Sequence, residues 1–312
     1  MKVSIILITY NHEKFIKTCL NSIFSQKIDF TWELIIAEDF SSDKTRNEID
    51  DFLKSKNNVN VIKLYKEQNI GLTKNYYDAC NRANGKYIAT ISGDDYWIDN
   101  TKLQKQVDFL ENNADYVICS THFKSLDNKT NILSDVPLPK KNTFTHQDVV
   151  LENPVIAGTA IFKSKLLTLI PNEAKKLKIE DLPMWWYFSR IGKIKYLSIV
   201  TLAYRQHDNN FYTSKDWAWM RAVTLSTKSK LNELTSSISG LEFIEQDWYK
   251  FIHVLTSNLS MIQKKEILLI FLKNRTKFNY FLKIAFDLLP NKLFILYFKI
   301  VYRLMNVKKN RI

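Results

Sequence analysis

Apolar and amphipathic stretches alternate over the first hundred positions of the chain. Four continuous apolar or β-branched runs predict buried strands. They lie at residues 2–10, 32–39, 58–65 and 86–91. The stretches between them carry apolar positions at helical spacing and predict helices. These lie at residues 11–26, 41–55 and 69–85. Asn11 is a candidate N-cap for the first helix. This alternation predicts an α/β fold, Rossmann-like, with a mostly parallel sheet and flanking helices.

The regular alternation of apolar runs and amphipathic stretches ends after Trp97. We expect a helix, a strand and a polar excursion over residues 101–148, then further strands that include residues 194–207. Helical spacing dominates from Trp217 onward. The sequence therefore predicts a first domain over residues 1–215, made of halves 1–100 and 101–215, and a C-terminal helical region over 216–312.

Polar groups follow three of the predicted strands. They are Thr9-Tyr10-Asn11, Glu38-Asp39 and Asp94-Asp95. Ligands of open parallel sheets bind outside the carboxyl ends of the strands, so we expect these groups on one rim.

The adjacent carboxylates Asp94 and Asp95 allow two interpretations. Gly-Asp-Asp is a common composition for a solvated turn. Alternatively, two acids at a strand end form a clamp for Mg²⁺ or Mn²⁺, and the cation offsets their mutual repulsion and neutralises a departing diphosphate. The residues alone leave both interpretations open.

Charge and cysteine content narrow the class of protein. The net charge is +13, but residues 261–312 carry +10 of it. A nucleic-acid-binding fold should be basic over the fold itself, so we expect no nucleic acid partner.

The three cysteines are far apart in sequence and predict free buried thiols. The apolar run near the N-terminus is too short for a signal peptide, so we expect none. We also expect no transmembrane helix.

Four blocks in order resemble the family-2 glycosyltransferases, which are inverting enzymes with a GT-A fold. The blocks are VSIILITYNHEKFIKTCLNSIFSQ, LIIAEDFSSDKT, NIGLTKNYYDACNRANGKYIATISGDDYW and EDLPMWWYFSRIGKIKYLSIVTLAYRQHDNN. The resemblance covers about residues 1–212 and implies a GT-A catalytic domain that binds a nucleotide diphosphate sugar.

The resemblance also implies roles for individual residues. Asp39 would accept a hydrogen bond from the base, expected to be uracil, Asp94 would approach the ribose, and Asp95 would bind Mn²⁺ or Mg²⁺. The whole nucleotide-binding set would be Thr9, Tyr10, Asn11, Glu38, Asp39, Ser41, Lys74, Asn75 and Asp94.

Asp181 matches the family's general base, which deprotonates the acceptor hydroxyl opposite the leaving diphosphate. Without the resemblance, an acid pair at a helix N-terminus is the better interpretation of Glu180-Asp181.

His207 would be a second metal ligand or a diphosphate ligand, with a polar loop residue as the alternative. Arg205 would contact the diphosphate. Trp185 and Trp186 would contact the diphosphate or stack on the acceptor sugar, with core packing as the alternative.

The implied function is transfer of a sugar, most often from a UDP-sugar, to a glycan or lipid-linked acceptor hydroxyl in bacterial surface polysaccharide synthesis. A nucleotidyltransferase and a non-catalytic nucleotide-sugar-binding protein are the alternatives. The turn TYNHEK lacks the glycine-rich loop usual in a nucleotidyltransferase.

The basic C-terminal region places Lys292, Lys299 and Arg303 on one helical face, opposite an aromatic one. This pattern favours peripheral contact with the inner face of the cytoplasmic membrane by an otherwise cytoplasmic protein. A packed helical bundle or a homodimer interface is the alternative.

Overall fold

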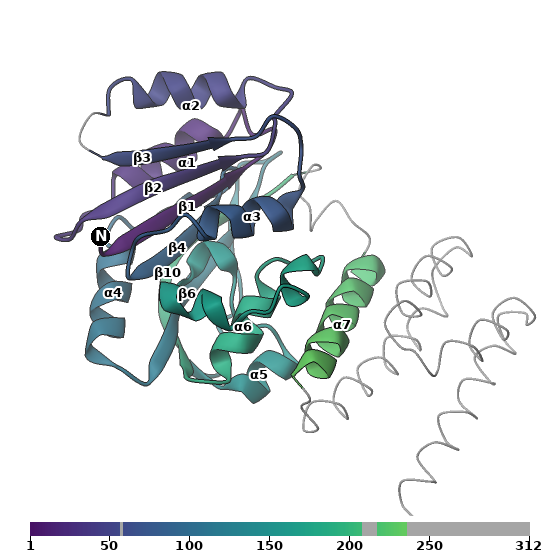
Figure 1. Cartoon of the computed structure of the whole chain (residues 1–312). Coiled ribbons are helices and arrows are strands. Elements are labelled where there is room, and N and C mark those ends of the chain that lie inside the picture. The colour runs from purple at the N-terminus through teal and green to yellow at the C-terminus, as the bar shows by residue number, and fades with distance from the viewer. Residues whose placement is uncertain (57–58, 208–216, 236–312) are drawn as a thin grey trace, which may run out of the picture. The chain divides into compact units, whose positions relative to one another are not determined.

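The computed structural model divides the chain into two compact units, residues 1–214 and 215–312 (Figure 1). It describes residues 1–56, 59–207 and 217–235. The first unit is built around one sheet. Its strands are β1 Val3–Thr9, β2 Trp32–Glu38, β3 Asn60–Tyr65, β4 Tyr87–Ser92, β5 Tyr96–Trp97, β6 Tyr116–Asp127, β7 Leu133–Asp135, β8 Thr143–Phe144, β9 Ile161–Lys163 and β10 Lys193–Gln206.

The α-helices of the described residues are α1 Ile16–Phe24, α2 Thr45–Leu53, α3 Leu72–Cys80, α4 Lys102–Asn112, α5 His146–Leu151, α6 Leu182–Ser189 and α7 Trp217–Leu234. Helices α1 to α6 belong to the first unit, and α7 belongs to the second. Three 3₁₀ turns, Ala157–Thr159, Ser164–Leu169 and Ala174–Lys176, complete the described elements.

The strand order is β3-β2-β1-β4-β9-β6-β10-β5. The first four strands are parallel, as are β6 and β10. Strand β9 is antiparallel to both of its neighbours, β4 and β6. The predicted α/β fold with a mostly parallel sheet and flanking helices is confirmed.

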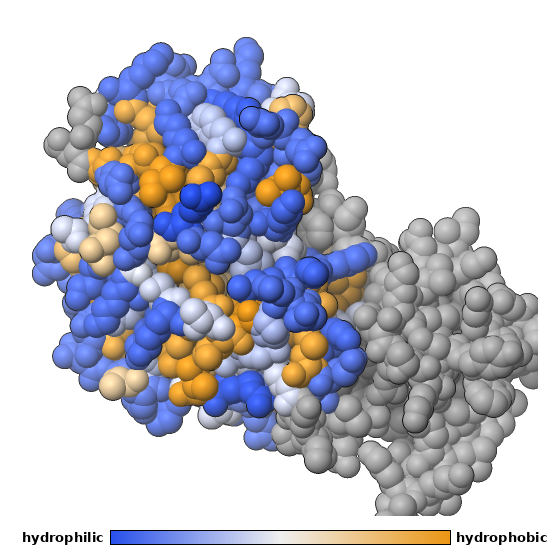
Figure 2. Space-filling view, viewed as in Figure 1, coloured by the Kyte–Doolittle hydropathy of each residue, from blue (hydrophilic) through white to orange (hydrophobic). Residues whose placement is uncertain are grey.

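Both faces of the N-terminal half of the sheet are covered, which explains its continuous apolar strands. All seven residues of β1 are buried. Val3, Ile5 and Leu7 share a core cluster with α1, α2 and α4. Helix α3 lies on the opposite face from α1 (Figure 1). Hydrophilic residues cover most of the coloured surface in Figure 2, and hydrophobic patches are exposed between them.

The structure also bears on predictions about the cysteines, the first helix and membrane-spanning helices. Cys19, Cys80 and Cys119 are free and buried, as predicted. Asn11 does not cap α1, because the helix begins five positions later at Ile16. No helix within the described residues has the length and apolar character needed to cross a membrane. The predictions of membrane contact and of a homodimer concern residues 292–303 and their surroundings, which lie outside the described residues.

Candidate functional site

Parallel pairing brings the predicted polar groups to one edge of the sheet. Thr9 at the end of β1 is in register with Glu38 at the end of β2. Ile8 is in register with Ser92 at the end of β4. The segments 9–12, 38–43 and 93–95 therefore leave the sheet at the same edge, as expected.

The loops after β1 and β2 are tied to each other. Asn11 has a positive φ of 55°, its backbone N–H donates to Ser41 Oγ at 2.9 Å, and its side-chain oxygen accepts from the Ser42 N–H at 2.8 Å. Asn tolerates this left-handed conformation better than most residues. Asn11 and Ser41 therefore fix the shape of the edge. Tyr10, between Thr9 and Asn11, is 44% exposed and is the side chain of this segment most accessible to a ligand.

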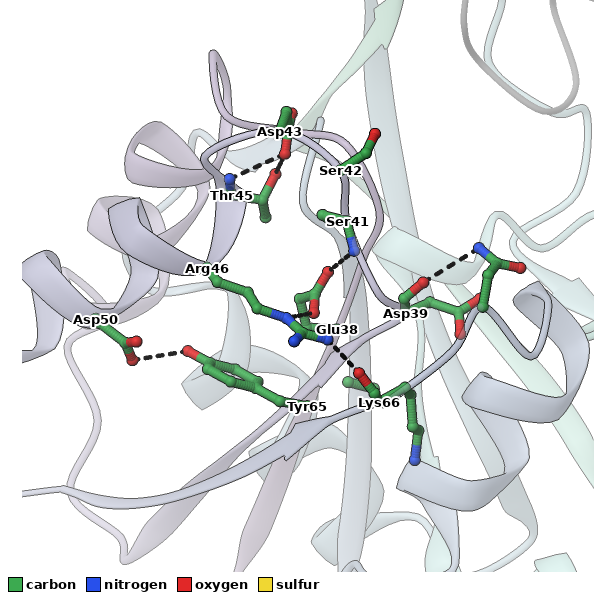
Figure 3. A network of polar contacts seen from close by, with 12 residues as sticks. Glu38, Asp39, Ser41, Ser42, Asp43, Thr45, Arg46, Asp50, Tyr65 and Lys66 are labelled. Carbon is green, nitrogen blue, oxygen red and sulfur yellow. Dashed lines mark hydrogen bonds and ion pairs between the residues drawn. The ribbon is translucent and has the colours of Figure 1, made fainter.

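The two acids at the end of β2, Glu38 and Asp39, have different surroundings (Figure 3). Glu38 accepts hydrogen bonds from the Ser41 backbone N–H and from Arg46 Nε, and its side chain is fully enclosed. Glu38 therefore shapes the loop, and its contact with a nucleotide stays a prediction.

Asp39 receives the backbone N–H groups of Ile70 and Gly71 at 2.8 and 2.9 Å. Burial raises the pKa of Asp39, and these two donors act against that rise. Asp39 thus joins the loop after β3 to the edge. Its predicted contact with a base would use the remaining acceptor capacity of the carboxylate.

The two residues of α3 that were predicted to bind the nucleotide differ in exposure. Lys74 is exposed. Asn75 is fully buried, and its side-chain N–H donates to the Ala37 carbonyl at 2.9 Å. Asn75 therefore anchors α3 to β2, and its contact with a nucleotide stays a prediction.

Asp94 and Asp95 are both buried rather than solvated. The Asp95 Oδ1 atom accepts the backbone N–H of Arg205 at 2.8 Å, and Arg205 Nε donates to the Asp94 carbonyl at 2.9 Å. The end of β10 is thereby joined to the turn after β4. The solvated-turn interpretation does not fit this geometry.

The Asp94 side chain meets two imidazoles. Its Oδ2 lies 3.1 Å from His207 Nε2 and 3.7 Å from His12 Nε2. Burial favours the neutral acid, but the charge of His12 and the hydrogen bond from His207 outweigh it and hold the pKa of Asp94 at about 2. Burial and then the charge of Asp94 raise the pKa of Asp95. The environment thus separates the two carboxylates, as expected for like charges in one site.

His12 was not selected from the sequence. One signal was present, since it follows Thr9-Tyr10-Asn11 at the same strand end. His12, Asp94 and His207 each offer a ligand atom, and these atoms lie within 4.8 Å of one another. Two imidazole nitrogens and one carboxylate oxygen are a suitable donor set for a divalent transition-metal ion. The residues present therefore fit a metal.

Asp181 occupies the N-cap position of α6 and is buried. Its Oδ2 accepts the indole N–H of Trp185 at 3.1 Å. Burial raises the pKa of Asp181 to about 6, although the indole donor lowers it. The position at a helix start is thus confirmed. A raised pKa at a buried acid also marks a candidate functional group.

Tyr204 on β10 links the two acid pairs. Burial raises its pKa, and the charges of Asp95, Asp94, Glu180 and Asp181 raise it further. Both pairs therefore act on the same phenol. The Tyr77 hydroxyl also donates to the Glu180 carbonyl at 2.9 Å, which fixes this acid pair against α3.

Trp185 and Trp186 are both 0% exposed. The ring of Trp185 packs edge-on against Phe162, and that of Trp186 against His146. This burial corrects the expectation that they contact a diphosphate or an acceptor sugar. Trp185 instead holds the carboxylate of Asp181.

Arg205 is nearly buried, and its guanidinium lies 4.6 Å from the centroid of the Phe15 ring. It also donates to the Asn128 side-chain oxygen at 3.2 Å. Its contact with a diphosphate stays a prediction, made from a position beside the acids.

Known proteins place the chain in a family. The family model described as glycosyl transferase family 2 matches residues 4–167. The Mycobacterium tuberculosis protein Rv1520 is 35% identical over 117 residues, 38% of this chain and 34% of that protein. This chain therefore aligns with about a third of that relative's length.

Two further proteins extend the comparison. The Escherichia coli UDP-Glc:alpha-D-GlcNAc-diphosphoundecaprenol beta-1,3-glucosyltransferase WfgD is 32% identical over 184 residues, 59% of this chain and 68% of the enzyme. The crystal structure of S. aureus TarS 1-349 in complex with UDP has a TM-score of 0.56 at 22% identity and covers 74% of this chain and 65% of that one. This likeness confirms the GT-A fold. From the matched residues and these relatives we conclude that the chain belongs to glycosyl transferase family 2.

Proposed function

We propose that this protein is an inverting glycosyltransferase that moves a sugar from a UDP-sugar to a hydroxyl of a glycan or lipid-linked acceptor. One observation carries the proposal: His12, Asp94 and His207 bring three candidate metal-ligand atoms within 4.8 Å of one another, and Asp181 is a separate buried acid at the start of α6. Inverting transfer needs one group of negative charge for the diphosphate's cation and a separate base for the acceptor.

The donor and acceptor classes are proposed from the relatives. WfgD carries a UDP-sugar and a diphosphoundecaprenol acceptor in its name, and TarS was crystallised with UDP. A role in bacterial surface polysaccharide synthesis is part of the same proposal, and the lipid-linked acceptor in the name of WfgD supports it. Exposed Tyr10 and the Asp39 carboxylate are the groups we assign to the base, and Arg205 is assigned to the diphosphate.

Asp181 is the proposed general base. With a pKa of about 6, it is mostly ionised near pH 7 and still basic enough to accept a proton. As the hydroxyl oxygen bonds to the anomeric carbon, the bond to the diphosphate oxygen breaks and the hydroxyl proton passes to Asp181. A divalent cation, when bound at the end of β4, supplies neutralisation of the leaving diphosphate.

The proposal is tested with the full chain in two steps. UDP-, GDP- and dTDP-sugars are compared by thermal shift with Mn²⁺ present, and a ligand that binds only the folded protein raises the melting temperature. UDP release is then measured with GlcNAc-diphosphoundecaprenol and related acceptors.

We expect a UDP-sugar to give the largest shift, and Asp181→Asn to keep that shift while losing acceptor-dependent UDP release. Binding without turnover on any acceptor, in wild type and variant alike, favours a non-catalytic nucleotide-sugar-binding protein. Full turnover by Asp181→Asn would show that Asp181 is not the general base.

A further inference from the structure

Two aromatic side chains are exposed at the edge of the sheet where the acids gather. Tyr10 is 44% exposed and Phe40 is 48% exposed. Among the residues that the structure describes, no other Phe, Tyr or Trp side chain is exposed. An aromatic ring left in water forgoes the free energy of burial, so two of them at one edge indicate a surface for a flat ligand.

The loops after β1 and β2 run alongside each other on both sides of these residues. The Asp39 backbone N–H donates to the Thr9 carbonyl at 3.1 Å, and the Asn11 backbone N–H donates to Ser41 Oγ at 2.9 Å. Each exposed aromatic residue lies between the two bonded positions of its own loop. The two aromatic side chains therefore leave the backbone at matching positions.

The backbone of Phe40 has a conformation that phenylalanine rarely adopts. Its φ is 63°, in the left-handed region. The other two non-glycine residues with positive φ in the described part of the chain are Asn11 and Asn131, and asparagine tolerates this region. A bulky side chain there is strained, and strained residues cluster at ligand-binding sites, where the surrounding structure holds them. The conformation of Phe40 therefore marks it as a candidate contact residue.

Arg46 supports the ring of Phe40. Its guanidinium lies 5.5 Å from the centroid of the Phe40 ring and 5.3 Å from that of the Tyr65 ring. The guanidinium is itself fixed, because it donates to the Glu38 carboxylate and to the Lys66 carbonyl (Figure 3). A guanidinium over an aromatic face is a favourable contact, so Arg46 gives the ring a preferred orientation. The ring of Phe40 is thus held in place and still exposed.

The carboxylate of Asp39 adds hydrogen-bonding capacity beside this ring. It accepts the backbone N–H groups of Ile70 and Gly71 at 2.8 and 2.9 Å, and a carboxylate has further lone pairs to offer. A nucleobase has two flat faces and a rim of N–H and carbonyl groups. It therefore matches a site made of aromatic rings and a carboxylate.

We propose that Phe40 is a base-contacting residue, whose ring stacks on the nucleobase of the donor as a second aromatic surface beside Tyr10. Stacking suits any base, because every base has a flat π-face. The strained backbone is what places a ring at this point of the loop. The inference rests on the proposed function for the identity of the ligand as a nucleotide, but binding is measured without an acceptor and without turnover.

The experiment measures how much the base adds to binding. Dissociation constants of UDP, GDP and the base-free analogue ribose 5-diphosphate are determined by calorimetric titration of the full chain with Mn²⁺ present. Phe40→Asn removes the ring but introduces a residue type that tolerates the left-handed backbone. It should weaken binding of the preferred nucleotide by about 5-fold to about 100-fold, the range expected for one stacked base, and should leave ribose 5-diphosphate binding unchanged.

Phe40→Tyr and Ile191→Asn are the controls. Phe40→Tyr keeps an aromatic ring at the position and should keep most of the affinity that the base adds. Ile191 is 57% exposed and precedes the start of β10, whereas the acids contact the other end of that strand. Ile191→Asn should therefore leave all three dissociation constants unchanged. Melting temperatures of the ligand-free variants identify any that fail to fold.

The outcomes separate this inference from the proposed function. Unchanged nucleotide affinity in Phe40→Asn overturns the inference, and so does an equal weakening of nucleotide and ribose 5-diphosphate binding, which would mean that only the loop has changed. Wild type that binds neither UDP nor GDP more tightly than ribose 5-diphosphate also overturns it. A Phe40-dependent gain for GDP but not for UDP supports the inference and contradicts the proposed donor. The same gain for UDP without transfer to any acceptor supports the inference, and the proposed transfer reaction then fails.

Discussion

Replacing Trp185 by Phe removes the indole N–H that donates to Asp181 Oδ2 across 3.1 Å inside the protein. A hydrogen bond to a charged group contributes about 1.5–3 kcal/mol, and one between neutral groups about 0.5–1.5 kcal/mol. The indole therefore favours ionised over neutral Asp181 by about 1–1.5 kcal/mol. At about 1.4 kcal/mol per pKa unit, the variant's Asp181 pKa should rise from about 6 to about 7.

The direction of the stability effect follows from linkage. The folded pKa of Asp181 lies above the ordinary value of 3.8, so its contribution to stability is present at low pH and is lost as pH rises through about 6. A higher folded pKa enlarges the loss. Trp185→Phe should therefore destabilise the protein by about 1–3 kcal/mol near pH 5, from lost packing, and by about 1–1.5 kcal/mol more near pH 8.5.

Urea unfolding followed by circular dichroism at these two pH values measures the difference. Phe188→Leu is the matched control, since Phe188 is equally buried on α6 and packs on Phe162. Its penalty should not change with pH. The double variant with Asp181→Asn should lose the pH dependence as well. An equal penalty for Trp185→Phe at both pH values would refute the proposed control of Asp181 by the indole.

Three further changes test the loops and the core. Phe40 has a positive φ of 63°, a conformation that disfavours any Cβ by about 1 kcal/mol, so Phe40→Gly should be more stable than Phe40→Ala by about that amount in urea unfolding. Equal stabilities would contradict this reasoning. Arg46→Met leaves the enclosed Glu38 carboxylate without its guanidinium partner and should lower the free energy of unfolding by about 3 kcal/mol; a loss under about 1 kcal/mol would mean that water reaches Glu38. Gly85→Ala would place a Cβ 2.4 Å from the backbone nitrogen of Ser4, which cannot move aside, so a loss of about 2–3 kcal/mol is expected and an unchanged melting temperature would contradict the close approach.

The N-terminal half of the sheet could be predicted because its signals are local. The apolar runs that became β1, β2 and β4 are too uniformly apolar for a half-exposed strand, and both of their faces proved to be covered. Parallel strands that alternate with helices must end at a common edge. The meeting of segments 9–12, 38–43 and 93–95 therefore followed from order along the chain.

The individual roles could not be predicted in the same way. Glu38 and Asp39 are adjacent acids, yet one is enclosed by Arg46 and the other binds two backbone N–H groups. Trp185 and Trp186 lie on a helix that is apolar on nearly every side, LPMWWYFS, which is the pattern of a buried helix. That signal could have shown that both indoles belong to the core.

The sequence by itself determined the fold class, the family and the edge of the sheet at which the acids gather, because hydrophobic period and strand order are encoded locally. Only the tertiary structure decided which acid meets which partner. His12, Asp94 and His207 are separated by 82 and 113 positions, and their convergence depends on strand register and on the bond between Asp95 and the Arg205 backbone. Long-range pairing of this kind leaves no periodic trace along the chain, so it becomes visible only when the strands are assembled.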